Sequence, residues 1–264
     1  VQDSLLPLPE GRPAVERITM ELPNPQLGNV VSEQTCLEQG VGTELRESVS
    51  SLVWLSQTLQ GENRSVTVTV QHEAHDTKHV LVENDPHRLP IGAAVDIGTT
   101  TVVVCLLDLD SEKILGTLAE ANVQRWAGAD VIARIAAAGN AESFARMRDG
   151  IRGQILKMLF ALTGKLGIEP DALERIVLAG NPTMLHLLVG ANPAGIAKAP
   201  FVPVFSAGMD LLPHGRGQEP WPFNPECRVI LIPGISAYVG ADIVAGLLAC
   251  GLDRPSQGTS LFLD

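Results

Sequence analysis

The chain has 264 residues, a hydrophobic fraction of 45% and a formal net charge of −11 at pH 7. This length and apolar content suffice for one large domain or two small ones with packed cores. The acidic balance argues against binding to nucleic acid, which requires Lys and Arg to neutralise phosphates, and an aromatic fraction of 4% leaves few rings to stack on bases.

The four cysteines lie far apart in the sequence and form no Cys-x-x-Cys pair. This spacing argues against an iron–sulfur or zinc site built from this segment and against a disulfide framework, so a reducing, cytoplasmic compartment is expected. Residues 176–197 carry no Asp, Glu, Lys or Arg, but their Asn and Pro residues predict a strand, a turn and a short helix. Neither a membrane span nor a membrane partner is therefore expected.

The first third of the chain predicts a linker followed by a small domain. Residues 1–13 carry three prolines and a glycine, a composition typical of a linker. Apolar alternation predicts strands at 15–22, 65–70 and 79–82, and helical spacing of apolar residues predicts a helix at 43–59. Together these elements favour a small α+β domain over residues 14–89.

Residues 90–264 predict an α/β domain, because strands and helices alternate after an initial run of strands. That run is a meander, expected at 93–97, 101–108 and 114–121. Helices are expected at 129–138, 142–166, 183–189 and 241–250, a loop-like run at 194–227, and further strands at 175–179, 228–232 and from 261. The longest helix has an apolar stripe from Ile151 to Leu162, and Gly167 fits its C-cap.

The turn between the first two strands of this domain is the most informative stretch. Residues 94–104 read Ala-Val-Asp-Ile-Gly-Thr-Thr-Thr-Val-Val-Val. Gly98 lets the backbone approach a ligand, and consecutive N–H groups in such a turn form an anion-binding concavity to which Thr99, Thr100 and Thr101 add hydroxyls. Asp96 could hold Mg²⁺ through water. The spacing alone fits a phosphate loop and an ordinary β-hairpin equally well.

Further motifs along the chain narrow the choice. They read Asn122-x-Gln-Arg-x-x-Gly-Ala-Asp-Val-Ile-x-Arg-Ile, Ala179-Gly-Asn-Pro-Thr-Met-Leu-His-Leu-Leu, Ala199-Pro-Phe-Val-Pro-Val-Phe and Pro233-Gly-Ile-Ser-Ala-Tyr-Val-Gly-Ala-Asp. Together with the Asp-x-Gly-Thr-Thr turn they resemble the reductive activators of corrinoid proteins, which belong to the actin/Hsp70/sugar-kinase ATPase superfamily (ASKHA). The resemblance covers residues 91–264, and residues 14–88 resemble, less specifically, the small middle domain of that family.

This resemblance implies a fold and an activity. The fold is the first half of an actin/Hsp70-like (ribonuclease H-like) ATPase domain, preceded by the small α+β domain. The activity is ATP-dependent reduction of a corrinoid (B12) methyl-carrier protein from Co(II) to Co(I). The cofactors implied are ATP and Mg²⁺, with electrons from an iron–sulfur cluster on a domain outside this chain. The partner is a corrinoid protein or a component of a corrinoid-dependent methyltransferase, and a homodimer stays open.

By the same analogy, Asp96, Gly98, Thr99 and Thr100 form the first phosphate loop. The second phosphate loop begins with an Asp at the end of a later strand, and Asp264 stands at that point, so Asp96 and Asp264 are the catalytic candidates. We therefore expect a piece of a longer protein that holds half of a nucleotide site.

Two other functions remain open at this stage. An ASKHA-fold small-molecule kinase would need an Asp aligned with a substrate hydroxyl, and a non-enzymatic module would use the domain only to bind a partner. Among the remaining polar residues, Asn181 or Thr183 is expected to cap a helix, with a position facing the nucleotide cleft or the corrinoid partner as the alternative. His186 is expected to be a buried core residue. Asp242 and Arg125 could approach Mg²⁺ and phosphate, but a helix-dipole role and an exposed surface position explain them equally well.

Overall fold

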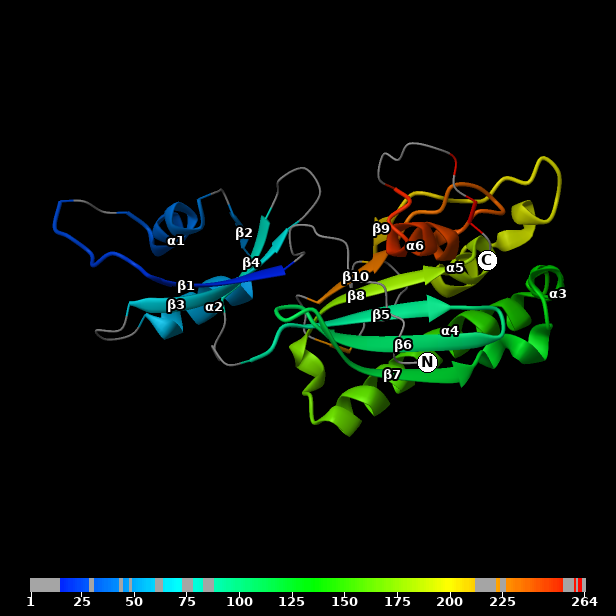
Figure 1. The fold of residues 1–264 in the computed structure, drawn as a ribbon, viewed down its shortest axis with the longest axis horizontal. Coiled ribbons are helices and arrows are strands. Elements are labelled where there is room, and N and C mark those ends of the chain that lie inside the picture. Colours follow the sequence, from blue (N-terminus) through cyan, green and yellow to red (C-terminus); the bar gives the residue numbers. More distant parts are fainter. Residues whose placement is uncertain are drawn as a thin grey trace. The chain divides into compact units, whose positions relative to one another are not determined.

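The computed structural model describes residues 15–28, 31–42, 45–47, 49–59, 64–72, 78–82, 88–211, 222–223, 227–253, 259 and 261–262. Contacts divide these residues into two compact units (Figure 1). The described residues up to Ile91, together with Asp108–Lys113, form the smaller unit. Gly92–Leu107 and the described residues from Ile114 onward form the larger one.

The smaller unit is a sheet with two helices. Its elements are β1 (Val15–Glu21), α1 (Glu33–Val41), β2 (Leu45–Glu47), α2 (Val49–Thr58), β3 (Ser65–His72) and β4 (Lys78–Val82). The strand order is β1-β3-β4-β2, in which β3 pairs antiparallel with both β1 and β4, and β2 pairs parallel with β4. The alternating Val66, Val68 and Val70 of β3 are at most 1% exposed and pack in one core with Leu37 and Leu55 of the two helices.

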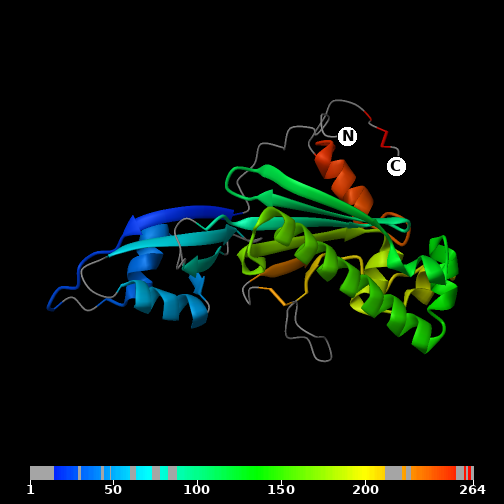
Figure 2. The ribbon, with the colours of Figure 1, turned by 90° about the horizontal axis from the view of Figure 1, so that it is seen from below.

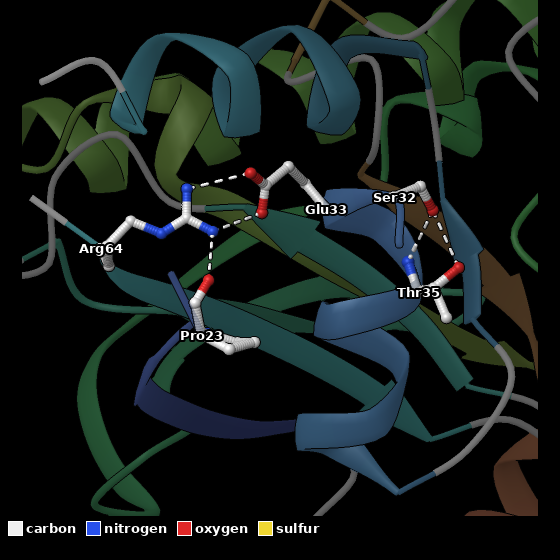
Figure 3. Close-up of polar contacts among 5 residues, drawn as sticks. All are labelled: Pro23, Ser32, Glu33, Thr35 and Arg64. Carbon is white, nitrogen blue, oxygen red and sulfur yellow. Dashed lines mark hydrogen bonds and ion pairs between the residues drawn. The ribbon is translucent and has the colours of Figure 1, made fainter. Parts of the chain in front are cut away.

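A polar cluster secures the start of α1 (Figure 3). Ser32 is the N-cap, and its Oγ accepts a 3.1 Å hydrogen bond from the Thr35 amide. Arg64 donates to both carboxylate oxygens of Glu33, at 2.9 and 2.7 Å, and to the Pro23 carbonyl at 2.7 Å. The side chain of Arg64 is only 10% exposed, so this bidentate pair ties the chain before β3 to the first turn of α1.

The larger unit is built on a six-stranded sheet with the order β7-β6-β5-β8-β10-β9. Its strands are β5 (Ile91–Ile97), β6 (Thr101–Asp108), β7 (Lys113–Ala121), β8 (Leu173–Gly180), β9 (Met209–Asp210) and β10 (Arg228–Leu231). Its helices are α3 (Val131–Ala137), α4 (Ala141–Leu166), α5 (Pro182–Val189) and α6 (Ala241–Ala249), with 3-10 turns η2 (Val123–Ala127), η3 (Pro170–Ala172) and η4 (Pro193–Ile196). β10 runs parallel to β8 and antiparallel to β9.

Helices cover both faces of this sheet. Figures 1 and 2 show α4 and α5 on one face and α6 on the other. The apolar stripe of α4, from Met147 to Leu162, is at most 3% exposed, and Gly167 ends the helix in the left-handed conformation. Within the described ranges, no helix combines the length and the apolarity needed to cross a bilayer.

The expected fold class is confirmed, a mixed α/β arrangement with a small α+β unit before it. The meander of β5, β6 and β7 and the later strand–helix units follow the predicted order. These elements could be predicted because each is long and strongly periodic, so the local pattern and the tertiary packing agree.

Two predicted elements differ in the structure. The helix expected at 43–59 is the strand β2 followed by the shorter helix α2, because Leu45–Glu47 pairs with β4, a partner far along the chain. The strand expected from 261 is not formed by Leu261 and Phe262. A Cβ added to Gly246 would lie 2.5 Å from Phe262 Cζ, so the Phe262 ring packs on α6 instead. Leu263 lies outside the described residues.

We expect Arg64→Lys to lower the free energy of unfolding of the smaller unit by about 1 kcal/mol, because Lys lacks the fork that reaches both oxygens of Glu33. Urea unfolding followed by fluorescence measures the change. Trp54 of α2 serves as the reporter in a background in which Trp126 and Trp221 are replaced by Phe.

The control for this experiment is Gln39→Ala, an exposed position on the same helix α1. It should change the free energy of unfolding by less than about 0.5 kcal/mol. Glu33→Gln should cost about as much as Arg64→Lys, and the two losses should not add, because both remove one ion pair. Additive losses would contradict the role given to this pair.

Candidate functional site

The side chain of Asp96 lies on the exposed side of the end of β5. Val95 and Ile97, its neighbours in the strand, are 2% and 0% exposed, whereas Asp96 is exposed. Because successive side chains of a strand point to opposite faces, the pleat turns this carboxylate away from the core. A carboxylate in that position is accessible to a cation.

The turn after β5 is anchored by all three of its carbonyl groups. Asn122 Nδ2 donates to the Gly98 oxygen at 2.7 Å, and the Asn122 amide donates to the Thr100 oxygen at 2.8 Å. Between them, Arg134 Nη2 donates to the Thr99 oxygen. A trans peptide directs its N–H opposite to its C=O. The amides of Thr99, Thr100 and Thr101 therefore point away from these anchors.

This geometry fits a phosphate. Three successive amide donors face the same side, which is the donor set of a backbone anion site. Thr100 and Thr101 are exposed, so their hydroxyls are accessible on that turn. A Cβ at Gly98 would lie 2.7 Å from the Thr101 carbonyl oxygen, so the tight turn admits no side chain there.

Asn181 joins the turn from the neighbouring strand. It follows β8, and its Oδ1 accepts a 3.0 Å hydrogen bond from the Met184 amide, so it caps α5 as expected. Its Nδ2 also donates to Thr99 Oγ1 at 3.1 Å. The cap fixes which end of the amide is oxygen, because only oxygen accepts from an N–H. Thr99 Oγ1 therefore accepts from Asn181 and keeps its own proton to donate.

A third segment reaches the same edge of the sheet, the loop that follows β10. A Cβ added to Gly240 would lie 2.7 Å from Pro182 Cδ, 2.8 Å from Asn181 Cα and 2.6 Å from Asp242 Oδ1. Only glycine allows this approach, which brings the start of α6 next to the start of α5. The carboxyl ends of neighbouring parallel strands in α/β sheets are where ligands bind.

The predicted site residues are thus partly brought together. Gly98, Thr99 and Thr100 form the turn, and Asp96 near the end of β5 and Thr101 at the start of β6 flank it. Asp264 lies outside the described residues.

Asp242 and Arg125 are the two other polar residues that the sequence analysis considered for the site. Asp242 Oδ1 accepts a 2.9 Å hydrogen bond from the Ile243 amide in the first turn of α6. Arg125 is an exposed residue of η2. The contacts that Asn122 and Arg134 make with the turn were not expected. The sequence feature that could have indicated the role of Arg134 is its position as the one charged residue in the otherwise apolar helix α3.

Mg²⁺ binding here would rest on Asp96 rather than on a cluster of ligands. Among the described residues, no group of three or more His, Cys, Asp or Glu side chains is placed to hold a metal ion. Mg²⁺ keeps several waters and is commonly bound by one or two carboxylates together with substrate phosphates. One exposed carboxylate beside a row of phosphate donors is compatible with that mode.

His186 is a core residue with both ring nitrogens engaged. It is 0% exposed, and its ring stacks on Phe205 with centroids 4.3 Å apart. Nε2 accepts a 2.9 Å hydrogen bond from the Val204 amide, so the proton lies on Nδ1, which donates to the Pro182 carbonyl at 2.6 Å. This neutral tautomer leaves no lone pair for a metal.

Known proteins resemble the chain over most of its length. The model of a family described as the RACo middle region matches residues 91–255. Corrinoid activation enzyme RamQ of Eubacterium limosum is 31% identical over 194 residues, which are 69% of this chain and 32% of RamQ. A solved structure described as a reductive activator for a corrinoid, iron–sulfur protein matches 96% of this chain and 40% of its own, with a TM-score of 0.79 and 31% identity. The chain thus spans about a third of the length of RamQ.

The neutral state of His186 should make stability depend on pH. Burial lowers the pKa of His186 from 6.5, and the Pro182 carbonyl offsets this in part. Below pH 6.5 this histidine binds a proton in the unfolded chain but not in the folded chain. Its contribution to the free energy of unfolding is therefore present above pH 6.5 and is lost as the pH falls. His186→Phe removes that contribution. The difference in unfolding free energy between wild type and variant should therefore shrink by about 1–2 kcal/mol between pH 7.5 and 5.

Urea unfolding at several pH values measures this difference. The control is Phe205→Leu, which removes the ring stacked on His186 but leaves both hydrogen bonds of the imidazole. Because the imidazole and its two hydrogen bonds remain, its cost should vary with pH by less than the cost of His186→Phe. A pH-independent cost of His186→Phe would contradict the neutral, doubly bonded imidazole.

Proposed function

We propose, from the premise that this chain belongs to the RACo middle-region family, that it binds the phosphates of ATP within a longer reductive activator of a corrinoid protein. The observation that carries the proposal is the turn Gly98–Thr100, whose three carbonyl groups are all bonded inward. The family match places this turn within its matched range, and a row of outward amides suits the phosphates of a nucleotide.

The names of the relatives support a role in the reductive activation of a corrinoid protein. RamQ is a corrinoid activation enzyme, and the solved relative is a reductive activator for a corrinoid, iron–sulfur protein. By analogy, the partner of this protein is a corrinoid protein or a corrinoid-dependent methyltransferase component in the cytoplasm. Its cobalt gains one electron on going from Co(II) to Co(I). An iron–sulfur cluster in the rest of the full-length protein would supply that electron.

The residues of this chain would act on the phosphate end of the nucleotide. Asp96 would hold Mg²⁺ through water, while the amides and hydroxyls of Thr99, Thr100 and Thr101 would bind phosphate oxygens. Asp264 would begin the second phosphate loop. In this scheme the described half provides fixed donors, and nucleotide binding provides the free energy that is coupled to electron transfer.

Asp96→Asn in the full-length protein should weaken binding of Mg²⁺·ATP by about tenfold or more, which corresponds to ~1.4 kcal/mol, because it removes the charge that faces the cation. Titration calorimetry measures the affinity. The matched control is Asp108→Asn, at the opposite end of β6, whose carboxylate bonds the Asp110 and Ser111 amides. Its affinity should remain that of wild type, and an equal affinity for Asp96→Asn would refute the assignment.

The activation itself is tested with the full-length protein, a reductant and a corrinoid protein in the Co(II) state. The absorbance of Co(I) should develop only when ATP and Mg²⁺ are present, because reduction to Co(I) is unfavourable without coupling. A reaction without ATP gives the baseline. Equal formation of Co(I) with and without ATP, or none in either case, would count against the proposed function.

A further inference from the structure

The helix α3 contains a single charged side chain, and that side chain is fully buried. Its sequence is Val-Ile-Ala-Arg-Ile-Ala-Ala, and Arg134 is 0% exposed. Removing a guanidinium from water costs several kcal/mol unless hydrogen bonds compensate for the lost hydration. An apolar residue would fill this helix position without that cost, so the contacts of Arg134 need an explanation.

Those contacts link the turn Gly98–Thr100, called the phosphate turn below, to two other segments. Nη2 donates to the Thr99 carbonyl, and Nε donates to the Gly128 carbonyl at 3.1 Å. Nη1 lies 3.2 Å from Gln124 Oε1 and 3.1 Å from Met184 Sδ. Arg134 therefore bridges the turn after β5, both ends of the η2 region and the start of α5.

The charge of Arg134 is not cancelled by these contacts. Its four partners are two backbone carbonyls, an amide oxygen and a thioether sulfur, all of them neutral. Asp130, the N-cap of α3, attracts the guanidinium, while burial lowers the pKa of Arg134. An arginine remains protonated under such a shift. A full positive charge thus lies behind the turn.

We propose that Arg134 is a positioning residue for the phosphate turn, an inference that rests on the function proposed above. It holds the central carbonyl of the turn, that of Thr99, and so directs the Thr100 amide toward the phosphate. It also places a cation whose direct hydrogen-bond partners are all neutral on the inner side of the same peptide, where it attracts the phosphate through a poorly screened interior.

The experiment uses Arg134→Met, Arg134→Lys and the matched control Arg152→Met in the full-length protein. Arg152 is partly buried, whereas Arg134 is fully buried, but it likewise donates to a backbone carbonyl, that of Leu188 at 2.9 Å. Arg152→Met removes the same charge and the same type of hydrogen bond as Arg134→Met, but Arg152 donates to Leu188 and not to the turn. Arg134→Lys keeps the charge without the fork.

The first measurement needs no nucleotide. The Asn122 amide donates to the Thr100 carbonyl and is a reporter of the turn, since Asn122 is 1% exposed. Hydrogen exchange of the peptide containing Asn122, followed by mass spectrometry, should be about tenfold faster in Arg134→Met than in wild type or Arg152→Met. Equal exchange in both Met variants would overturn the positioning role.

The second measurement is the affinity for Mg²⁺·ATP. Arg134→Met should weaken it by about tenfold and Arg134→Lys by less, while Arg152→Met should leave it unchanged. Equal losses in Arg134→Met and Arg152→Met would overturn the proposal in favour of a general stabilising role. If Arg134→Met does not fold, Arg134→Lys carries both measurements with the same signs. Failure of wild type to bind Mg²⁺·ATP would refute the proposed function, whereas hydrogen exchange would still decide the role of Arg134 in the turn.

Discussion

The larger unit depends on how the peptide groups of one turn are satisfied. The carbonyls of Gly98, Thr99 and Thr100 each accept a hydrogen bond from Asn122 or Arg134 on the inner side of the turn. Because each peptide is planar and trans, its N–H points opposite to its C=O. The amides of Thr99, Thr100 and Thr101 therefore face outward. The donor row is therefore a consequence of inner hydrogen bonds made by Asn122 and Arg134, which lie outside the Asp-x-Gly-Thr-Thr motif.

Sheet topology then decides what else reaches this turn. β5 and β8 are neighbours, so Asn181 after β8 lies beside Thr99 after β5, and their side chains meet at 3.1 Å. β10 is the next strand, and the loop after it approaches Asn181 at Gly240. Residues more than a hundred positions apart thus share one edge. The same amide of Asn181 caps α5 and contacts Thr99, so its helix-capping role and its place at the site are two results of one side chain.

An element could be predicted from the sequence when the pattern that specifies it lies within the element itself. The strands on either side of the turn are apolar runs bounded by turn residues, and α4 carries its own apolar stripe and C-cap, so these elements could be predicted. The strand β2 could not, because Leu45–Glu47 becomes a strand only by pairing with β4. The roles of Asn122 and Arg134 could not be predicted either. Both residues stand in the motif that begins at Asn122, but their residue types carry no information about which carbonyl they will meet after folding.

A turn held in this way is already organised before a ligand arrives. Binding a phosphate to it costs little conformational entropy, because the peptide planes are fixed by hydrogen bonds that exist without the ligand. A ligand shifts a conformational equilibrium only through contacts that differ between two states. In the proposed scheme, a movement that couples nucleotide binding to electron transfer would therefore arise in groups outside this turn, and Gly98–Thr100 would supply fixed donors to the phosphates.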